Sequence, residues 1–333
     1  MPRVFLLGAT GTIGQATARA LVAAGHEVVA LVRPRSGGGG AQGLEAVAGR
    51  LPGVTLRAGD VTDPASLTRD GFAGGRFDVM VSCLASRTGV PADAWAIDHR
   101  AHVQALAAAR AAGVRQVVLL SAICVQKPVL AFQQAKLAFE KTLQDEAAAD
   151  PGFAYSIVRP TAFFKSLAGQ VERVRGGKPF LVFGDGRVTA CKPISDDDLG
   201  AFLAACIDHP DRRNRILPLG GPGPAITPLD QAAMLSDLLG QPVPVKRVPL
   251  GLMDVIVGVL SLGGLLLPRL RAKAELARIG RYYATESMLV WDAARGRYDA
   301  DATPSAGQDT LRDYYARLIA GTATLERGEH AVF

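Results

Sequence analysis

The sequence has few cysteines and little charge. Four cysteines occur in 333 residues, far apart and never as a Cys-x-x-Cys pair: Cys83, Cys124, Cys191 and Cys206. This spacing excludes a disulfide scaffold, the usual zinc sites and iron–sulfur ligation, so we expect no bound metal and reduced cysteines in a cytoplasmic protein. Charged residues make up 20% of the chain and hydrophobic residues 49%, which favours a large core over disorder.

The basic residues form no stripe and no block. The formal net charge is +6 and the pI about 9.3, but scattered lysines and arginines are not typical of a nucleic-acid interface. A mild positive charge agrees better with anionic small molecules or an anionic membrane surface. We find no internal repeat. The first expected strand begins at residue 3, so we expect no signal or transit peptide.

A glycine-rich turn lies at the start of the chain. An apolar strand at 3–7 leads into Gly8-Ala9-Thr10-Gly11-Thr12-Ile13-Gly14, and a helical run follows at 13–24. Three glycines at this spacing, between a strand and a helix, are typical of a dinucleotide site in which a diphosphate lies on the helix N-terminus. We therefore expect a nucleotide cofactor, held by Gly8, Thr10, Gly11, Thr12, Ile13 and Gly14.

Strands and helices alternate through the first half of the chain. Short apolar runs predict strands at 3–7, 27–32, 54–58, 77–82, 116–121 and 154–158, with helices at 13–24, 93–111 and 132–148. This pattern predicts an α/β fold, a Rossmann-type doubly wound parallel sheet with a smaller C-terminal substrate-binding part. We expect a cofactor-binding domain over 1–160 and a substrate-binding region over 161–333, from which about 195–220 returns to the sheet.

The second half has a different rhythm. Residues 177–194 are expected to be extended and to reverse at Gly184-Asp185-Gly186 as a hairpin. Ser195 and the acidic run 196–198 predict a helix N-terminus, where carboxylates stabilise the dipole more often than they bind a metal. A strand is expected at 215–219, and Thr227-Pro228 predicts another helix start.

Arg33 follows the second strand directly, where an acidic residue would bind the ribose 2′-hydroxyl of NAD. A basic residue there favours the 2′-phosphate of NADPH; the alternative is an ordinary surface arginine. Residues 35–43 contain four consecutive glycines, 37–40, and are expected to form a flexible loop.

Other site residues follow from the ends of the strands, because ligands of open parallel sheets lie beyond the carboxyl ends. The positions that follow the third, fourth, fifth and sixth strands are expected to line the cofactor crevice. They are Asp60, Val61, Cys83, Leu84, Ala85, Ser121, Pro160, Thr161 and Phe163.

Phe132 and Lys136 lie four residues apart on an expected helix, and so on one face of it. The pair resembles the Tyr-x-x-x-Lys of short-chain dehydrogenases with its tyrosine replaced. In that family the lysine binds the nicotinamide ribose and the tyrosine protonates a carbonyl oxygen. Carbonyl reduction needs an acid at the oxygen, so Phe132 favours reduction of a conjugated carbon–carbon double bond, or a protein that binds NADP without turnover. Lys136 and Phe132 are the candidate catalytic positions.

The segment 250–267 is very apolar and is followed by Arg269, Arg271, Lys273, Arg278 and Arg281. Its length is at the lower limit for a membrane span, and Asp254 and several glycines argue against one. We expect an apolar wall for the substrate or a contact with a membrane surface.

A resemblance to a known family is carried by the glycine turn and by five longer stretches: 121–140, 155–165, 183–195, 286–291 and 297–305. The sequence is similar to the NADPH-dependent divinyl (proto)chlorophyllide a 8-vinyl reductases, atypical members of the extended short-chain dehydrogenase family. A looser likeness to NmrA-like proteins covers the first 160 residues.

The resemblance implies reduction of the 8-vinyl group of a divinyl tetrapyrrole with NADPH. Because the glycine turn and Arg33 favour a hydride donor and the cysteines lack cluster spacing, we expect no requirement for ferredoxin, flavin or a metal cluster. The alternative is a non-catalytic NmrA-like sensor or assembly factor. Because plant relatives carry a transit peptide, the short start points to a bacterium. From the cysteines and the apolar segment we expect a cytoplasmic protein, with 250–281 as a peripheral contact on the photosynthetic membrane.

A substrate of this kind needs a wall for its macrocycle and a partner for its propionate. Four phenylalanines are candidates for the wall, or else plain core residues: Phe163, Phe164, Phe180 and Phe183. Three basic residues are candidates for the propionate, or else a solvated surface: Lys178, Arg187 and Lys192.

Overall fold

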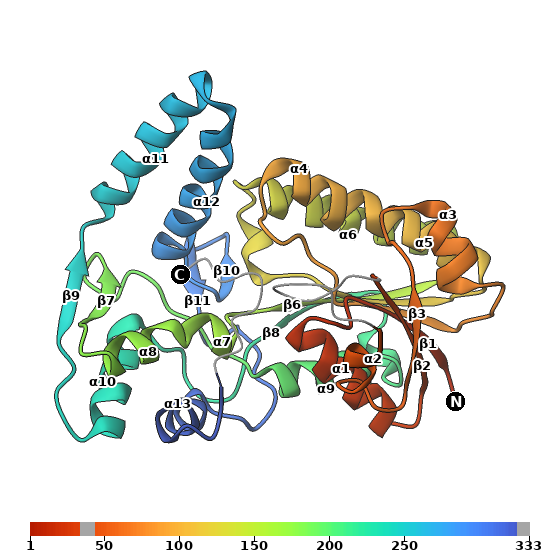
Figure 1. The fold of residues 1–333 in the computed structure, drawn as a ribbon, viewed down its shortest axis with the longest axis horizontal. Helices are drawn as coiled ribbons and strands as arrows, with labels where there is room; N and C mark the ends of the chain where they lie inside the picture. The colour runs from red at the N-terminus through yellow and green to blue at the C-terminus, as the bar shows by residue number, and fades with distance from the viewer. Residues whose placement is uncertain (34–43, 325–333) are drawn as a thin grey trace. The chain divides into compact units, whose positions relative to one another are not determined.

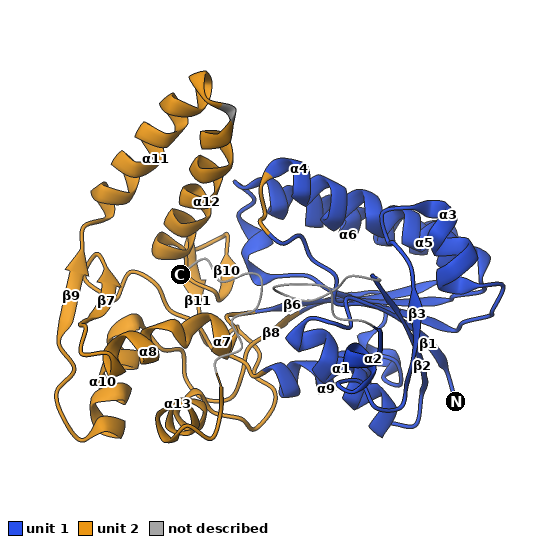
Figure 2. Ribbon diagram, in the orientation of Figure 1, with its two compact units in different colours: residues 1–87, 91–160, 196–217 blue, residues 88–90, 161–195, 218–333 orange. Residues whose placement is uncertain are grey.

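The computed structural model describes residues 1–33 and 44–324. The glycine-rich segment 35–43 predicted as a loop lies outside these residues. The chain forms two compact units (Figure 2). The first consists of Met1–Arg87, Pro91–Pro160 and Asp196–Leu217, and the second of Thr88–Val90, Thr161–Ser195 and Pro218–Phe333.

A seven-stranded sheet is the centre of the first unit, in the order β3-β2-β1-β4-β5-β6-β8. The first six strands pair in parallel, and β8 continues the parallel run, because Asn214 bonds to Tyr155 at one end and Thr161 to Leu219 at the other. The strands are β1 Arg3–Leu7, β2 Glu27–Val32, β3 Val54–Ala58, β4 Val79–Ser82, β5 Gln116–Leu120, β6 Ala154–Pro160 and β8 Arg215–Leu219. The predicted doubly wound sheet and its strands are confirmed.

Helices cover both faces of this sheet (Figure 1), with α3, α4, α5 and α6 on one side and α1, α2 and α9 on the other. Their bounds are α1 Thr12–Ala23, α2 Leu44–Ala48, α3 Pro64–Ser66, η1 Leu67–Phe72, α4 Pro91–Ala94, η2 Trp95–Ala101, α5 His102–Ala111, η3 Ile123–Gln126, α6 Ala131–Ala149, α9 Asp196–Ala205 and η4 Pro210–Arg212. The acidic run 196–198 fills the first turn of α9 as predicted.

The core explains why the strands are apolar throughout. Both faces of a sheet covered by helices are dry, so Val4–Leu7 are all buried. Phe5 stacks on Phe72 at 4.0 Å between ring centroids, and Phe77 meets both rings edge-on. On the other side, α9 approaches α1 closely at Gly200, where a Cβ would lie 2.6 Å from the carbonyl carbon of Ala16.

One predicted helix differs from expectation. Residues 93–111 form three successive segments, α4, η2 and α5, of which η2 is a π-helix. The apolar pattern identifies a helix here but carries no signal for the wider turn. Such π-helical turns are frequent at functional sites.

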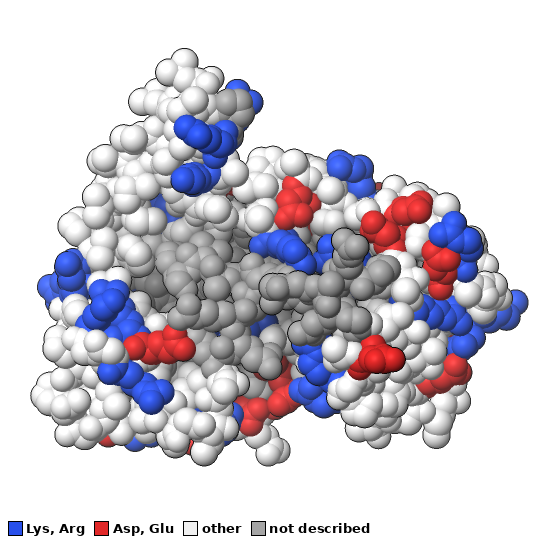
Figure 3. Space-filling model, in the orientation of Figure 1, with Lys and Arg blue, Asp and Glu red and all other residues white. Residues whose placement is uncertain are grey.

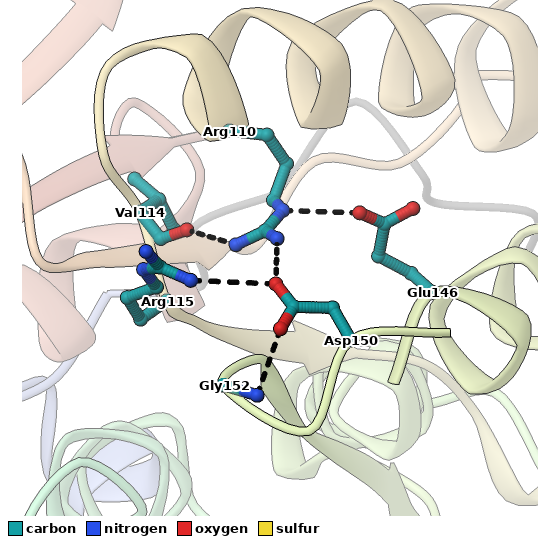
Figure 4. Close-up of polar contacts among 6 residues, drawn as sticks. All are labelled: Arg110, Val114, Arg115, Glu146, Asp150 and Gly152. Carbon is teal, nitrogen blue, oxygen red and sulfur yellow. Dashed lines mark hydrogen bonds and ion pairs between the residues drawn. The ribbon is translucent and has the colours of Figure 1, made fainter. Parts of the chain in front are cut away.

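The C-terminal end of α6 is fixed by a polar cluster (Figure 4). Arg110 of α5 donates to Glu146 at 3.0 Å, to the carbonyl of Val114 at 2.8 Å and to Asp150. Asp150 also accepts the N–H of Gly152. That hydrogen bond and Arg110 lower the pKa of Asp150, so the cluster holds α6 against α5 and β6.

The second unit has its own core and smaller sheets. Its elements are α7 Phe164–Leu167, α8 Gly169–Arg175, β7 Phe180–Phe183, α10 Pro228–Leu239, β9 Val245–Val248, α11 Leu250–Leu266, α12 Pro268–Thr285, β10 Val290–Asp292, β11 Arg297–Asp299 and α13 Leu311–Ala320. The fully buried Tyr315 lies in the core among α8, β7, α10 and α13. The helix predicted at Thr227-Pro228 is confirmed, with Thr227 as its cap.

The predicted hairpin at 184–186 is wrong. The chain does turn there, with Gly184 and Gly186 at positive φ, but β7 pairs in parallel with the distant β9. A Cβ on Gly186 would lie 2.8 Å from Cγ of Leu229 in α10. The glycines therefore serve the turn and this close approach, and the turn does not return the chain alongside β7.

Helices α11 and α12 pack against each other as an antiparallel hairpin. In the part of the chain that the structure describes, no helix has the length and apolar character needed to cross a bilayer.

Candidate active site

The turn from β1 to α1 is built around two glycines that tolerate no side chain. Gly8 has φ +78°, and a Cβ there would lie 2.5 Å from the carbonyl carbon of Cys83. A Cβ on Gly14 would lie 2.1 Å from the Gly8 oxygen. The first glycine therefore lets β1 approach the end of β4, and the third lets α1 pack on the turn.

Gly11 differs from both, because the protein leaves room beside it. The nearest atom to a Cβ at Gly11 is the Gly8 oxygen at 3.6 Å. Gly11 is the N-cap of α1, and the first turn of that helix has no acidic side chain. The positive end of the helix dipole thus adjoins an open backbone surface, which fits a diphosphate group. Thr10, Thr12 and Ile13 belong to the same turn.

Arg33 and Asp60 come together at the ends of β2 and β3. Gly59 donates to the carbonyl of Val32 at 3.0 Å, which brings the two strand ends side by side. Asp60 accepts the N–H and hydroxyl of Thr62 at 2.8 and 2.7 Å. These hydrogen bonds are the main reason that the pKa of Asp60 is lowered, and the positive charge of Arg33 lowers it further. Arg33 is exposed, and Val61 packs against the core.

The end of β4 lies against the glycine turn. Cys83 donates its N–H to Leu7, and its sulfur lies 3.5 Å from the hydroxyl of Thr17 in α1. Leu84 and Ala85 continue the chain, with the N–H of Leu84 donating to Ser82.

Ser121, at the end of β5, takes part in a buried polar cluster. Its hydroxyl donates to Glu140 of α6, a residue 2% exposed, and Arg159 of β6 donates to both carboxylate oxygens of Glu140. The buried charge is thereby paired and hydrogen-bonded, as a charge in this environment must be.

The start of α6 presents Phe132 and Lys136 on one face. Buried Gln133 fixes this end: its amide oxygen accepts the N–H groups of Val129 and Leu130, and its amide nitrogen donates to Cys124. Phe132 is buried, so the position of the short-chain dehydrogenase tyrosine holds a packed ring.

Lys136 forms an ion pair that the sequence analysis did not predict. Its ammonium lies 3.0 Å from Oδ1 of Asp98 in η2, and the Asp98 side chain is 0% exposed. Asp98 also accepts the hydroxyl of Ser86 at 2.6 Å and the Ser86 N–H at 3.2 Å. Because Ser86 follows Ala85, this carboxylate links α6 to the end of β4.

His102 is hydrogen-bonded to the same region. Its Nδ1 lies 2.8 Å from the carbonyl of Ile97, and its Nε2 lies 2.8 Å from the hydroxyl of Ser82. Burial lowers the pKa of His102 to about 4. The ring is therefore neutral near pH 7, donating to Ile97 and accepting from Ser82.

Pro160, the last of these positions in the first unit, ends β6. Thr161 and Phe163 belong to the second unit. Thr161 donates its N–H to Leu219 and its hydroxyl to the carbonyl of Lys192, and Phe163 forms a bridge with Ile194.

Two of the four phenylalanines considered for a macrocycle wall are core residues. Phe164 and Phe180 are buried in the hydrophobic core of the second unit, which leaves Phe163 and Phe183 as partly exposed rings. Lys178 and Arg187 are exposed, whereas Lys192 donates to the carbonyl of Thr303 at 2.9 Å.

Comparison with known proteins agrees with this geometry. An NAD(P)H-binding family model matches residues 8–210. The chain is 50% identical to divinyl chlorophyllide a 8-vinyl-reductase of Oryza sativa subsp. indica over 99% of its own length and 82% of that protein. It is 49% identical to the same enzyme of Zea mays, with the same coverage.

The chain belongs to the divinyl chlorophyllide a 8-vinyl-reductase family.

The fold of this 8-vinyl-reductase family member also matches a solved structure. The NADPH-dependent quinone oxidoreductase of Escherichia coli, complexed with NADPH, is 20% identical and aligns with a TM-score of 0.63 over 95% of this chain and 99% of that one. This match shows a Rossmann-like fold, and the family model together with the 8-vinyl-reductase relatives shows an NAD(P)H-binding oxidoreductase.

The first unit of this 8-vinyl-reductase relative brings most of the predicted cofactor residues to one edge of its sheet. The glycine turn contacts Cys83, Arg33 adjoins Asp60, and Lys136 is joined to the end of β4 through Asp98. The sequence analysis missed Asp98, Ser86 and Glu140, whose partners are distant in the chain. No local signal marks Asp98, because His99 and Arg100 follow it directly and its surroundings look like an ordinary polar helix face.

Proposed function

We propose that this protein reduces the 8-vinyl group of divinyl chlorophyllide a, or of divinyl protochlorophyllide a, to an ethyl group with NADPH. The observation that carries the proposal is the 50% identity to a reductase of this substrate over 99% of the chain. That similarity extends well beyond the NAD(P)H-binding match at 8–210. A likeness confined to the cofactor part would support any NADPH-binding protein, including a sensor.

NADPH supplies a hydride when bound. We assign its diphosphate to the N-terminus of α1, where Gly8, Gly11 and Gly14 keep the backbone bare. Arg33 is suited to the 2′-phosphate, because a guanidinium forms strong charge-assisted bonds to phosphate. Asp60 and Val61 would flank the adenine, and Cys83, Leu84, Ala85, Ser121 and Pro160 would line the crevice.

Lys136 is assigned the nicotinamide ribose, as in the short-chain dehydrogenases it resembles. Asp98 would act as a positioning residue, since a buried carboxylate that also accepts two hydrogen bonds from Ser86 holds the ammonium in one place. Phe132 supplies no acid. None is needed at this position if charge that develops on the vinyl group spreads into the conjugated macrocycle, because no alkoxide forms.

The substrate region is assigned to residues 161–333, with Thr161 and Phe163 next to the nicotinamide. Phe163 and Phe183 are the rings left for the macrocycle, and Lys178 and Arg187 are exposed cations suited to its carboxylate. A flat, largely apolar pigment with one carboxylate collects at the lipid–water boundary. We accordingly assign the reaction to the surface of a photosynthetic membrane.

The test is turnover by the purified protein with NADPH and divinyl chlorophyllide a alone. We expect a blue shift of the Soret band, because the vinyl group leaves conjugation, together with equimolar NADPH consumption. Lys136→Ala should slow this reaction, whereas Lys141→Ala, an exposed lysine further along the same helix, should not. Tight NADPH binding without product would instead indicate a sensor or assembly factor, and dependence on reduced ferredoxin would also contradict the proposal.

A further inference from the structure

Helix α11 exposes an apolar stripe along its whole length. Five side chains spaced three or four residues apart lie on one face, each between 50% and 84% exposed. They are Leu252, Val255, Val259, Leu262 and Leu266. We refer to these five residues as the α11 stripe. A continuous exposed row of this kind marks a surface that contacts an apolar partner.

Helix α12 satisfies the polar groups of α11 and leaves the stripe uncovered. Arg281 pairs with Asp254, Arg278 donates to Ser261 at 2.9 Å, and Arg271 donates to the carbonyl of Gly264 at 2.9 Å. A Cβ on Gly263 would lie 2.7 Å from Cδ1 of Leu270, so the glycine lets this leucine pack closely against α11. The two helices are therefore joined by specific contacts, and the hairpin that they form has one exposed apolar face.

The charge of the hairpin indicates the partner. Residues 250–285 contain five basic and two acidic side chains. Both acids are ion-paired inside the hairpin, Asp254 with Arg281 and Glu275 with Arg278. Arg269, Arg271 and Lys273 are exposed at the start of α12. Figure 3 shows basic side chains near the tip of the hairpin and a white, uncharged surface over the part of α11 that faces the viewer. An apolar row next to a basic cluster matches a lipid surface with anionic headgroups.

We propose that the α11–α12 hairpin docks on a bilayer that contains anionic lipid. The α11 stripe enters the boundary between headgroups and acyl chains, and Arg269, Arg271 and Lys273 contact the headgroups. A second copy of this chain is a poorer occupant, since it would bring a like positive charge to the contact. The inference rests on the proposed membrane location and identifies the surface responsible; it does not depend on the reaction.

The experiment is vesicle flotation without NADPH or tetrapyrrole, so its outcome is separate from that of the turnover test. We expect binding to phosphatidylcholine vesicles that contain phosphatidylglycerol and much weaker binding to phosphatidylcholine alone. Arg269→Gln with Lys273→Gln should weaken binding to the vesicles that contain phosphatidylglycerol by about fivefold for each charge removed. Binding to phosphatidylcholine alone should not change. Lys141→Gln is the matched exposed-charge control.

The stripe is tested with Val259→Asp plus Leu262→Asp, which should abolish binding to both kinds of vesicle. Val129→Asp is the control, because Val129 is 70% and Leu262 69% exposed. As a second readout, Leu262→Trp should add emission that shifts to the blue with phosphatidylglycerol vesicles. The proposal is overturned if wild-type protein does not float, if the stripe variant floats equally well, or if light scattering shows a dimer that the stripe variant dissociates.

Discussion

The ammonium of Lys136 lies 3.0 Å from a carboxylate oxygen of Asp98, and the two residues come from different helices, α6 and η2. Lys136 is 12% and Asp98 0% exposed at the side chain. Charges this well buried cost free energy unless they are paired. The pair therefore fixes the position of the lysine and ties the stability of the first unit to the geometry of its candidate site.

Asp98→Asn should destabilise the protein and raise KM for NADPH. The substitution leaves the part-buried Lys136 ammonium without its counter-charge, which costs about 3 kcal/mol in the free energy of unfolding. Asp145→Asn, which breaks the exposed pair with Lys141 on the same helix, should change it little. Urea unfolding of both variants measures the difference; equal losses would contradict the structural role of Asp98.

Arg33→Glu should weaken NADPH binding roughly tenfold to hundredfold and shift preference toward NADH. The change removes a charge-assisted contact to the 2′-phosphate and adds a carboxylate suited to a ribose hydroxyl. Dissociation constants for both cofactors give the result. Arg215→Glu, at the opposite edge of the same sheet, is the control, and an unchanged NADPH/NADH ratio for Arg33→Glu would rule out the assignment.

Phe132→Tyr should leave vinyl reduction essentially unchanged. A new general acid raises a rate about 100-fold or more when the reaction needs one, and reduction of a conjugated vinyl group builds no alkoxide. The pH–rate profile of the variant is the measurement. A large gain in kcat with a new tyrosine-like ionisation would show that the reaction does require an acid at this position.

Stability should fall as the pH falls from about 6.5 toward 4, because of His102. The pKa of its buried ring lies near 4 in the folded protein and at 6.5 for an ordinary histidine. As the pH falls through this range, the His102 ring stays neutral in the folded protein but takes up a proton in the unfolded protein. The stabilisation that comes from keeping His102 neutral is thus fully present above about pH 6.5. The free energy of unfolding should fall by about 2 kcal/mol between about pH 7.5 and pH 5 for this reason.

Urea unfolding at these two pH values, compared with His102→Gln, isolates the histidine. The variant should be less stable throughout but should lose less stability between the two values. Carboxylates with lowered pKa, such as Asp60 and Asp150, titrate below this window. An identical pH dependence in both proteins would refute the assignment to His102.

Local patterns predicted the sheet because strands buried on both faces must be continuously apolar. Runs such as Val4–Leu7 therefore identify themselves. The glycine turn does so too, because its glycine spacing and the strand and helix on either side of it lie within a short stretch of sequence. The pairing of β7 with β9 could not be predicted in this way, because the turn at 184–186 states only that the chain bends. Its partner strand begins at Val245.

The candidate site was predictable where it depends on strand ends and not where it depends on distant side chains. Arg33 and Asp60 follow strands that are neighbours in the sheet. Asp98 and Lys136 are 38 positions apart, and nothing near either residue specifies the other. Glu140 was likewise hidden, since an acid on a helix is ordinarily a solvated one.

The π-helical segment Trp95–Ala101 has an evolutionary consequence. A π turn accommodates one residue more than an α turn, so the segment behaves as a tolerated insertion within a helix. Losing that residue would restore regular geometry, which ordinarily favours a helix, but would turn Asp98 by about 100° relative to α5. Sequence drift that shortens this helix by one position would then cost Lys136 its counter-charge, and lineages that keep the lysine should keep the length of this segment as well.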